Sequence, residues 1–266
     1  MTTQDAQLSV MDTGGDGPVV VLLHGLAGSG RELLPTAEAL SPELRVLVVD
    51  QRGHGASTRR PADVSRAAFV ADVVTVVESL APGRKVCLVG QSMGAHTAFL
   101  VAHARPDLVD RLVMLEGHVR GGEPGEAARL GAWFASWPLP FAHEQTARAF
   151  LGPSPLTEAW VADLERTPAG LRPRFDADVM EAVLAAVHEP RWEEWRSLTV
   201  PTLAVFAENG MFTVEQQDEL VAARAATERA VLRGAGHDAH LDVPDAWTDL
   251  LRRYLLTARG RPSPAP

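Results

Sequence analysis

The stretch VCLVGQSMGAHTAFLVAHA, residues 86–104, decides the fold of this chain. It opens with a short apolar run that is typical of a strand buried on both faces, and it closes with a helical pattern over 93–104. Between the two, Gly90 and Gly94 flank Ser92 in a G-x-S-x-G pattern. Glycines there remove side chains that would collide in a sharp turn from strand to helix. The turn would expose the Ser92 hydroxyl as a nucleophile, and simple capping of the helix is the alternative.

Similar apolar runs without polar alternation recur on both sides of this stretch. They cover residues 18–25, 45–50, 111–117 and 201–207, and a last strand is expected over 228–234. Helical patterns lie between them, over 31–40, 62–80, 213–226 and 246–256. Such alternation is typical of right-handed crossovers that place helices on both faces of a sheet. The sequence therefore predicts an α/β fold with a mostly parallel, twisted sheet flanked by helices.

The alternation breaks between residues 118 and 198. This interval has no strand-like run, is cut into short helical pieces by prolines, and holds five of the six tryptophans. We expect a helical cap inserted into a core formed by residues 1–117 and 199–266. Trp133, Trp137 and Phe141 are predicted to line an apolar substrate cavity under the cap. The same aromatic residues could instead build the core that a cap needs for itself.

Composition and charge exclude several classes of partner. The net charge of −9 and the lack of a clustered basic run argue against a nucleic-acid partner. No run approaches the roughly 20 apolar residues that a membrane span requires, and no signal peptide is visible. The single cysteine, Cys87, lies in an apolar strand and suits a reducing compartment. A cytoplasmic location is expected, the oligomeric state stays open, and the Pro-rich tail 258–266 is expected to be frayed.

One of nine histidines is favoured as the base that a serine nucleophile needs. His237 follows the last expected strand, so its ring should reach the same edge of the sheet as Ser92. His96 and His103 are expected on the helix behind the nucleophile. His237 and His240 could be read as a metal pair, but no set of carboxylates or cysteines accompanies them. The sequence therefore predicts no metal and no cofactor.

Four segments in this order resemble the α/β-hydrolase superfamily over about residues 8–258. They are LLHGLAGSG (22–30), DQRGHGAS (50–57), GQSMG (90–94) and GAGHDAHLDVP (234–244). The resemblance implies an acyl-enzyme formed on Ser92. It also implies an oxyanion hole made by the backbone N–H groups of Leu26 and Met93.

The acid that should orient His237 is missing from its usual place. In members of the superfamily it commonly falls at the position of Gly210 in FAENGMFT (206–213). Some relatives hold the acid at the end of the preceding strand, where this chain has Glu116, and a carboxylate buried there needs a partner. We therefore predict Ser92, Glu116 and His237 as the catalytic triad. Glu208 is the rival acid, and orientation by Asn209 or by no group is a third possibility.

The expected reaction is hydrolysis of an ester, a lactone or a related carbonyl bond in a small molecule with an apolar portion. An esterase or lactonase fits best. The resemblance also leaves room for a C–C bond hydrolase or a perhydrolase that uses the same residues. A protein of a different class, a ligand-binding pseudo-hydrolase, gains support from the empty position at Gly210.

Overall fold

The computed structural model describes residues 1–3, 5–41 and 43–256; the tail 258–266 lies outside them. The described residues form one seven-stranded sheet in the order β1-β3-β2-β4-β5-β8-β9. All neighbouring strands are parallel except β1 and β3. The strands are β1 (Val10–Asp12), β2 (Val19–Leu23), β3 (Arg45–Val49), β4 (Val86–Gln91), β5 (Val109–Leu115), β8 (Thr202–Ala207) and β9 (Thr227–Leu232). The predicted mostly parallel α/β sheet is confirmed.

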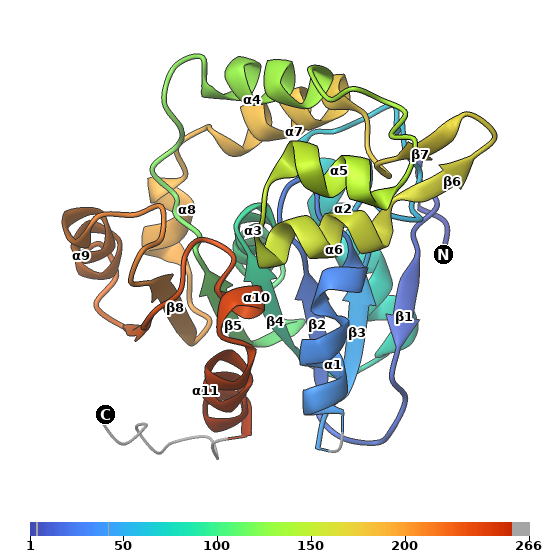
Figure 1. Cartoon of the computed structure of the whole chain (residues 1–266). Helices are drawn as coiled ribbons and strands as arrows, with labels where there is room; N and C mark the ends of the chain where they lie inside the picture. Colours follow the sequence, from blue (N-terminus) through green and yellow to red (C-terminus); the bar gives the residue numbers. More distant parts are fainter. Residues whose placement is uncertain (4, 42, 257–266) are drawn as a thin grey trace.

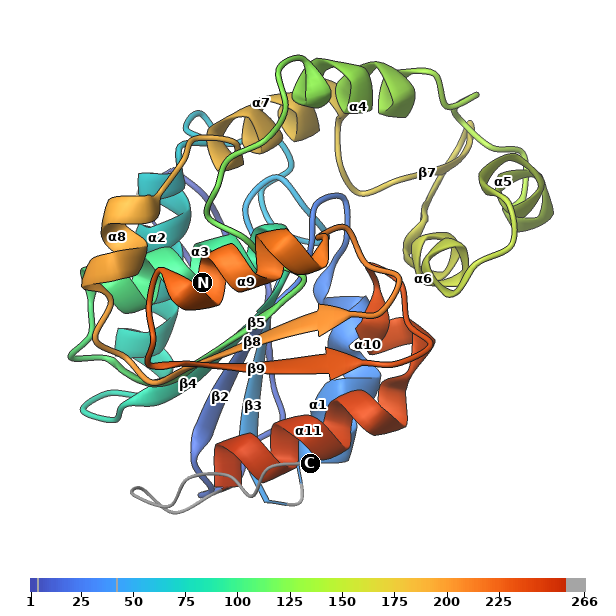
Figure 2. The same cartoon turned by 90° about the vertical axis from the view of Figure 1, so that its left-hand side faces the viewer.

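Helices cover both faces of the sheet, as Figures 1 and 2 show. On one face pack α2 (Arg66–Leu80), α3 (Met93–Ala104), α8 (Trp192–Ser197) and α9 (Val214–Ala222). On the other pack α1 (Leu34–Leu40), which follows the 3-10 turn η1 (Gly30–Leu33), and α11 (Pro244–Leu256). The strands β2, β4 and β5 have buried side chains on both faces, which explains why they read as continuous apolar runs.

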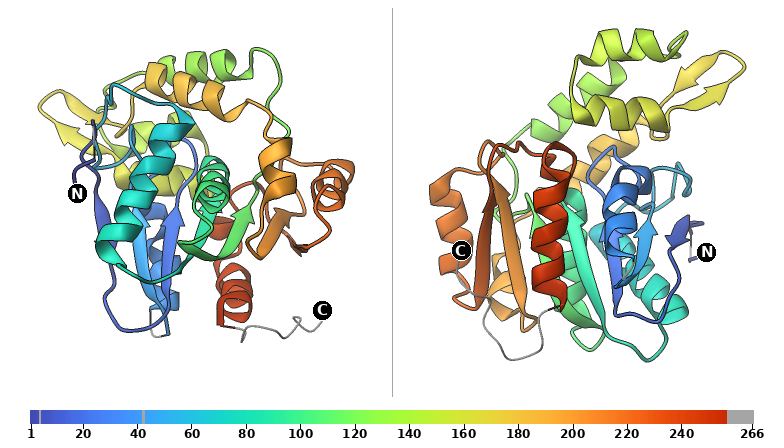
Figure 3. Two further views of the ribbon diagram at one scale, coloured as in Figure 1. Left: turned by 180° about the vertical axis from the view of Figure 1, so that it is seen from behind. Right: turned by 60° about the horizontal axis from the view of Figure 1, so that its bottom comes forward.

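Residues between β5 and β8 form the inserted segment, which lies above the carboxyl ends of the strands in Figure 1. Its helices there are α4 (Glu126–Ala135), α5 (Glu144–Leu151), α6 (Pro155–Asp163) and α7 (Ala177–Val187). It also contains a short antiparallel hairpin of β6 (Glu165–Thr167) and β7 (Gly170–Arg172), seen from two further sides in Figure 3. The sequence did not predict this hairpin, because its strands have only three residues each and are mostly polar.

Helix α8 belongs by its packing to the sheet rather than to the inserted segment. Trp195 is fully buried in the same cluster as the side chains of α3, and its ring meets that of Phe99 edge-on with centroids 5.7 Å apart. The predicted end of the inserted segment at residue 198 stays a prediction. The packing of Trp195 favours an end before α8.

The other differences from the sequence-based expectations lie at element ends. The edge strand β1 was missed because it is three residues long and mostly exposed. Helix α2 begins at Arg66 rather than at residue 62, because the Ser65 side chain accepts a hydrogen bond from the N–H of Ala68 and caps the helix there.

None of the helices in the described ranges has the length and apolar character needed to cross a bilayer.

Candidate active site

Ser92 lies on the sharp turn between β4 and α3. It has φ 52° and ψ −116°, a conformation that a residue with a side chain adopts only under strain. Both flanking glycines are needed there. A Cβ on Gly90 would come within 2.2 Å of the Gly94 carbonyl oxygen, and a Cβ on Gly94 within 2.2 Å of the Leu23 carbonyl oxygen. Both collisions would be with backbone atoms, which cannot move aside as a flexible side chain can. The turn that the G-x-S-x-G pattern predicts therefore needs glycine at these two positions.

Ser92 and His237 line one cavity of about 590 Å³ at the carboxyl ends of the strands. The ring of His237 is carried by the loop between β9 and the short helix α10 (Ala239–Asp242). Sequence position alone predicted this convergence, since parallel strands end at a common edge.

Glu116 follows β5 directly and turns its carboxyl group towards His237. Its backbone has φ 47°, which is unusual for a residue with a side chain, and its side chain is fully covered. Oε2 lies 3.2 Å from Nδ1 of His237. The carboxyl group also accepts hydrogen bonds from the backbone N–H groups of Ala207, at 2.8 Å, and Met211, at 2.7 Å. A carboxylate needs donors when buried; the two backbone N–H groups supply them, and Nδ1 of His237 adds a third in the tautomer that carries its proton there.

The carboxyl group of Glu116 occupies the space that a side chain at position 210 would fill. A Cβ built on Gly210 would lie 2.3 Å from Oε1 of Glu116. Glu208, the rival, instead accepts a hydrogen bond from the N–H of Gly234 at 2.9 Å on the exposed side of its loop. The structure thus brings Glu116 to His237 and leaves Glu208 elsewhere.

Leu26 and Met93, the predicted oxyanion-hole residues, both line the cavity around Ser92. Met93 is the first residue of α3, where a backbone N–H has no partner within its own helix. Leu26 lies in the loop after β2, next to Ala27 with φ 59°. Both residues therefore lie beside Ser92 as the role requires, and the role of their amides stays a prediction.

The three aromatic residues predicted to bind substrate do not share one location. Trp133 lines the cavity around Ser92. Trp137 and Phe141, in contrast, are 4% and 1% exposed and pack into the aromatic core of the inserted segment, with ring centroids 6.1 Å apart. These two do not line the cavity around Ser92 and belong to the core of the inserted segment, so their substrate-binding role stays a prediction. Phe134, an aromatic residue of the same sequence pattern, and Trp160, whose role the sequence did not single out, also line the cavity.

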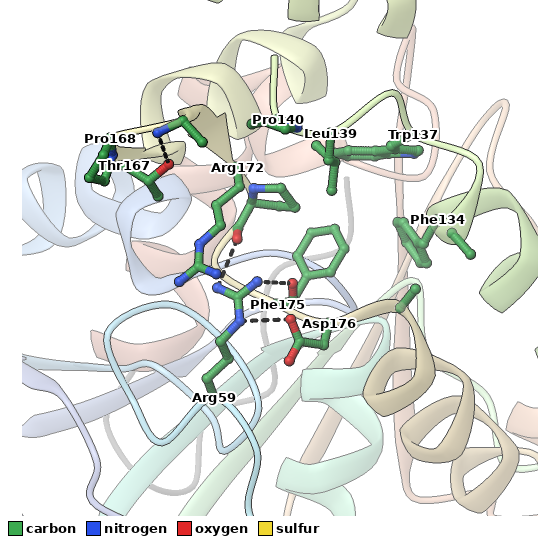
Figure 4. A pocket seen from close by; sticks show the side chains of 14 residues that line it. Arg59, Phe134, Trp137, Leu139, Pro140, Thr167, Pro168, Arg172, Phe175 and Asp176 are labelled. Atoms are coloured by element: carbon green, nitrogen blue, oxygen red, sulfur yellow. Dashed lines mark hydrogen bonds and ion pairs between the residues drawn. The ribbon is translucent and has the colours of Figure 1, made fainter. Parts of the chain in front are cut away.

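A second and larger hollow, of about 850 Å³, lies under the β6–β7 hairpin (Figure 4). Arg59 crosses it and forms ion pairs with Asp176 at 2.7 Å and Glu165 at 2.8 Å. Trp137 lines this hollow, whereas neither Ser92 nor His237 does. Because its charged groups are already paired with one another, we read this hollow as a joint between the inserted segment and the core.

Two more polar groups in the cavity wall were missed from the sequence. Glu32 is buried below the loop that carries Leu26, and burial together with the nearby charge of Asp238 raises the pKa of Glu32 to about 8. His96, expected behind the nucleophile, lines the cavity instead. Neither residue has a neighbouring motif that distinguishes it from an ordinary helix residue. In the described part of the chain, no three His, Cys, Asp or Glu side chains are grouped so that they could hold a metal ion.

Comparisons with known proteins agree with this architecture. Esterase YbfF of Escherichia coli (strain K12) is 28% identical over 242 residues, covering 89% of this chain and 92% of that protein. The mouse (Mus musculus) sn-1-specific diacylglycerol lipase ABHD11 is 41% identical over 122 residues, 45% of this chain but only 38% of the lipase. The crystal structure of E-2-(acetamidomethylene)succinate hydrolase superposes with a TM-score of 0.86 over 94% of this chain and 95% of that one, at 22% identity, which is a likeness of fold.

The model of the alpha/beta hydrolase family matches residues 20–250, which include the turn at Ser92, Glu116 and His237. This match covers most of the sheet, the inserted segment and every loop that lines the cavity. The chain belongs to the alpha/beta hydrolase family.

Proposed function

We propose that this protein is a serine hydrolase that cleaves a carboxylic ester, a lactone or a related carbonyl bond through an acyl-enzyme. The observation that carries the proposal is the contact between Glu116 and His237. The carboxyl group that makes this contact fills the space that a side chain at position 210 would occupy. The pseudo-hydrolase alternative drew its support from the missing acid at position 210. A carboxyl group that fills that space from the neighbouring strand removes this support.

The reaction uses the three residues in turn. His237 removes the proton from the Ser92 hydroxyl, which attacks the substrate carbonyl, and the backbone N–H groups of Leu26 and Met93 stabilise the oxyanion. Glu116 accepts a hydrogen bond from Nδ1, which keeps Nε2 free to act as the base and stabilises the imidazolium that forms. His237 then protonates the leaving group, and a water molecule repeats the sequence on the acyl-enzyme.

The substrate we propose is a small molecule with an apolar portion. A cavity of about 590 Å³ is in the range of small-molecule sites, and Trp133, Phe134 and Trp160 form an aromatic part of its wall. Trp133 is the one predicted cap residue that keeps a substrate-binding role in this proposal. A cytoplasmic location and the absence of nucleic-acid or membrane partners also remain part of it.

A serine-directed phosphonate probe tests the nucleophile, and a series of p-nitrophenyl esters tests the reaction. Wild-type protein should be labelled and should release nitrophenol, and Ser92→Ala should do neither. Lack of labelling in correctly folded wild-type protein would contradict the proposal. Labelling without ester turnover would favour the C–C bond hydrolase, to be assayed with a diketone, or the perhydrolase, to be assayed by peroxide-dependent halide oxidation.

A further inference from the structure

His96 lines the active-site cavity, and no described residue pairs with the polar atoms of its ring. It lies on α3 one helical turn after Ser92, and residues four apart share a helix face. The side chain is 1% exposed and lines the cavity. Among the described residues, neither Nδ1 nor Nε2 of the ring has a hydrogen-bond partner. Leaving a buried polar group unpaired is costly, which suggests that a partner arrives from outside the chain.

A positively charged side chain, that of Arg66, lies near His96 on the side of α2. Arg66, the first residue of α2, is 4% exposed and donates to Thr97, yet its Nε and Nη1 have no acceptor within the described residues. Burial and the charge of Arg191 lower the pKa of Arg66 to about 9. Burial, followed by the charges of Arg66, Arg191 and His188, lowers the pKa of His96 well below its ordinary value. At neutral pH His96 is therefore a neutral ring with one N–H to donate, in a positive field.

The acidic groups near this part of the cavity are already engaged or lie further out. Arg191 pairs with Glu189 and Glu194. Glu126, at the start of α4, lies 3.6 Å from Nε2 of His188 and its side chain is 34% exposed. No carboxylate is among the groups that set the pKa of His96 or that of Arg66. Arg66 is therefore the positive charge near His96 that no carboxylate pairs with in the described part of the chain.

We propose that His96 is a specificity-determining residue that binds a carboxylate on the acyl portion of the substrate. This inference rests on the proposed function of Ser92 as the nucleophile. The carboxylate accepts the hydrogen bond from the ring and gains from the field of Arg66, whose Nε and Nη1 have no acceptor among the described residues. The acyl side is assigned because the leaving group must lie beside His237, which comes from the loop after β9, whereas His96 lies on α3 and Arg66 on α2.

The test compares paired nitrophenyl esters that differ only in a terminal carboxylate, such as mono(4-nitrophenyl) adipate and 4-nitrophenyl hexanoate, with the adipate methyl ester as an uncharged polar control. The readout is the ratio of kcat/KM for the carboxylate ester to that for the neutral ester. In His96→Leu this ratio should fall about 10- to 100-fold, the size expected for a hydrogen bond to a charged group. His96→Gln keeps an N–H donor and should retain most of the ratio.

His103→Leu is the matched control, because His103 lies on the same helix but outside the cavity wall, and its ratio should equal that of the wild type. An unchanged ratio in His96→Leu, or an equal loss for both esters, would overturn the proposal. A preference for the methyl ester over the free carboxylate would overturn it as well.

A binding measurement separates this proposal from that of the serine mechanism. Glutarate is titrated calorimetrically into Ser92→Ala and into the double variant Ser92→Ala with His96→Leu. Binding that weakens about 10-fold or more in the double variant supports the subsite even when no ester is cleaved. Equal binding to both proteins, or none to either, would refute the subsite and leave the test of the nucleophile unaffected.

Discussion

The ends of β5 and β8 lie side by side in the sheet and carry opposite features. After β5, Glu116 has a long side chain on a backbone with φ 47°, and its carboxyl group contacts His237. After β8, Gly210 has no side chain and leaves the space that this carboxyl group occupies. The space between these two neighbouring loops therefore holds a single carboxyl group. Either loop could carry it, and here the loop after β5 does.

The comparison shows that the two positions depend on each other. An acid at position 210 would collide with Glu116, because even a Cβ there lies within 2.5 Å of three atoms of the carboxyl group. The backbone N–H groups of Ala207 and Met211, both from β8 and its loop, hold the carboxyl group although its residue belongs to β5. The loop after β8 thus supplies backbone donors for an acid that the end of β5 carries.

The largest effect is expected from Glu116→Gln, which removes the charge and keeps the size. In a serine protease, replacing the orienting acid by its amide lowers kcat about 10⁴-fold, because the base is left in the wrong tautomer. We expect a loss of that order in ester turnover, measured as kcat, with the melting temperature recorded for the same sample. Turnover within a few fold of the wild type would remove Glu116 from the mechanism.

Moving the acid back to the loop of β8 tests the comparison directly. Glu116→Ala should be as inactive as Glu116→Gln, and adding Gly210→Asp to it should recover about 10-fold or more of the lost turnover, since an orienting acid contributes up to about 10⁴-fold. The donors at Ala207 and Met211 remain to hold the new carboxylate. The control is Glu116→Ala with Gly210→Asn, which has the size but not the charge. Equal activity of the two double variants would show that the space alone, and not the charge, matters.

Gly210→Ala, with Glu116 in place, should have an intermediate effect. The added methyl group must displace the carboxyl group from the ring of His237, and overpacking of this kind typically costs about 1–3 kcal/mol. We expect roughly a tenfold loss of kcat/KM, since about 1.4 kcal/mol corresponds to a factor of ten. Chemical denaturation measures the loss of stability, and steady-state kinetics measures the loss of kcat/KM. Gly210 does not have a positive φ, so alanine adds no strain of that kind there and the loss reports the collision with Glu116.

Glu32 sharpens the comparison, because it is a buried carboxyl group that makes no hydrogen bond to a histidine among the described residues. It faces the charges of Asp238 and Asp163, and Nε2 of His240 lies 3.8 Å away. Burial first, and these carboxylates second, raise the pKa of Glu32 to about 8 from 4.5. The native protein therefore keeps a proton that the unfolded chain releases, so the free energy of unfolding falls as pH rises between these two values.

Glu32→Gln should remove the contribution of Glu32 to the pH dependence of the free energy of unfolding. That contribution is at most about 1.4 kcal/mol for each unit by which the pKa of Glu32 differs between the native and the unfolded chain. Urea denaturation of the wild type and the variant near pH 5 and near pH 8 measures it. Near pH 8 the variant should be more stable than the wild type. Near pH 5 the difference in stability between the two proteins should be smaller. Parallel curves for the two proteins would show that Glu32 is not protonated at neutral pH.

The sequence predicted the sheet, the crossover helices and the turn at Ser92 because each follows from local rules. Buried parallel strands read as apolar runs, and the glycines around Ser92 are demanded by backbone atoms that lie within a few residues or on the adjacent strand. The acid at Glu116 required more, since its role depends on an empty space at a position 94 residues later in the chain. That space could be inferred only from the resemblance to a family that usually fills it.

The parts that the sequence did not predict depend on packing between distant segments. Trp133 and Trp137 are four residues apart on one helical pattern, yet one faces the cavity and the other the core of the inserted segment. The path of the chain between α4 and α7 decides this, and the sequence carries no signal for it. Glu32 and His96 are similar, because their burial comes from other elements that close over them.

The smallest effect is expected from Glu208→Gln, the variant that separates the two candidate acids after β8 and β5. Glu208 accepts a hydrogen bond from the N–H of Gly234 at 2.9 Å, and a glutamine oxygen can accept the same bond. Turnover should therefore stay within about twofold of the wild type, since exposed substitutions of this kind usually change stability by less than about 0.5 kcal/mol. Both substitutions change a glutamate to its amide next to the same pair of loops, so the ratio of their effects reports only on which carboxyl group His237 uses. A severe loss in Glu208→Gln together with a mild one in Glu116→Gln would reverse the assignment and place the acid on the loop after β8.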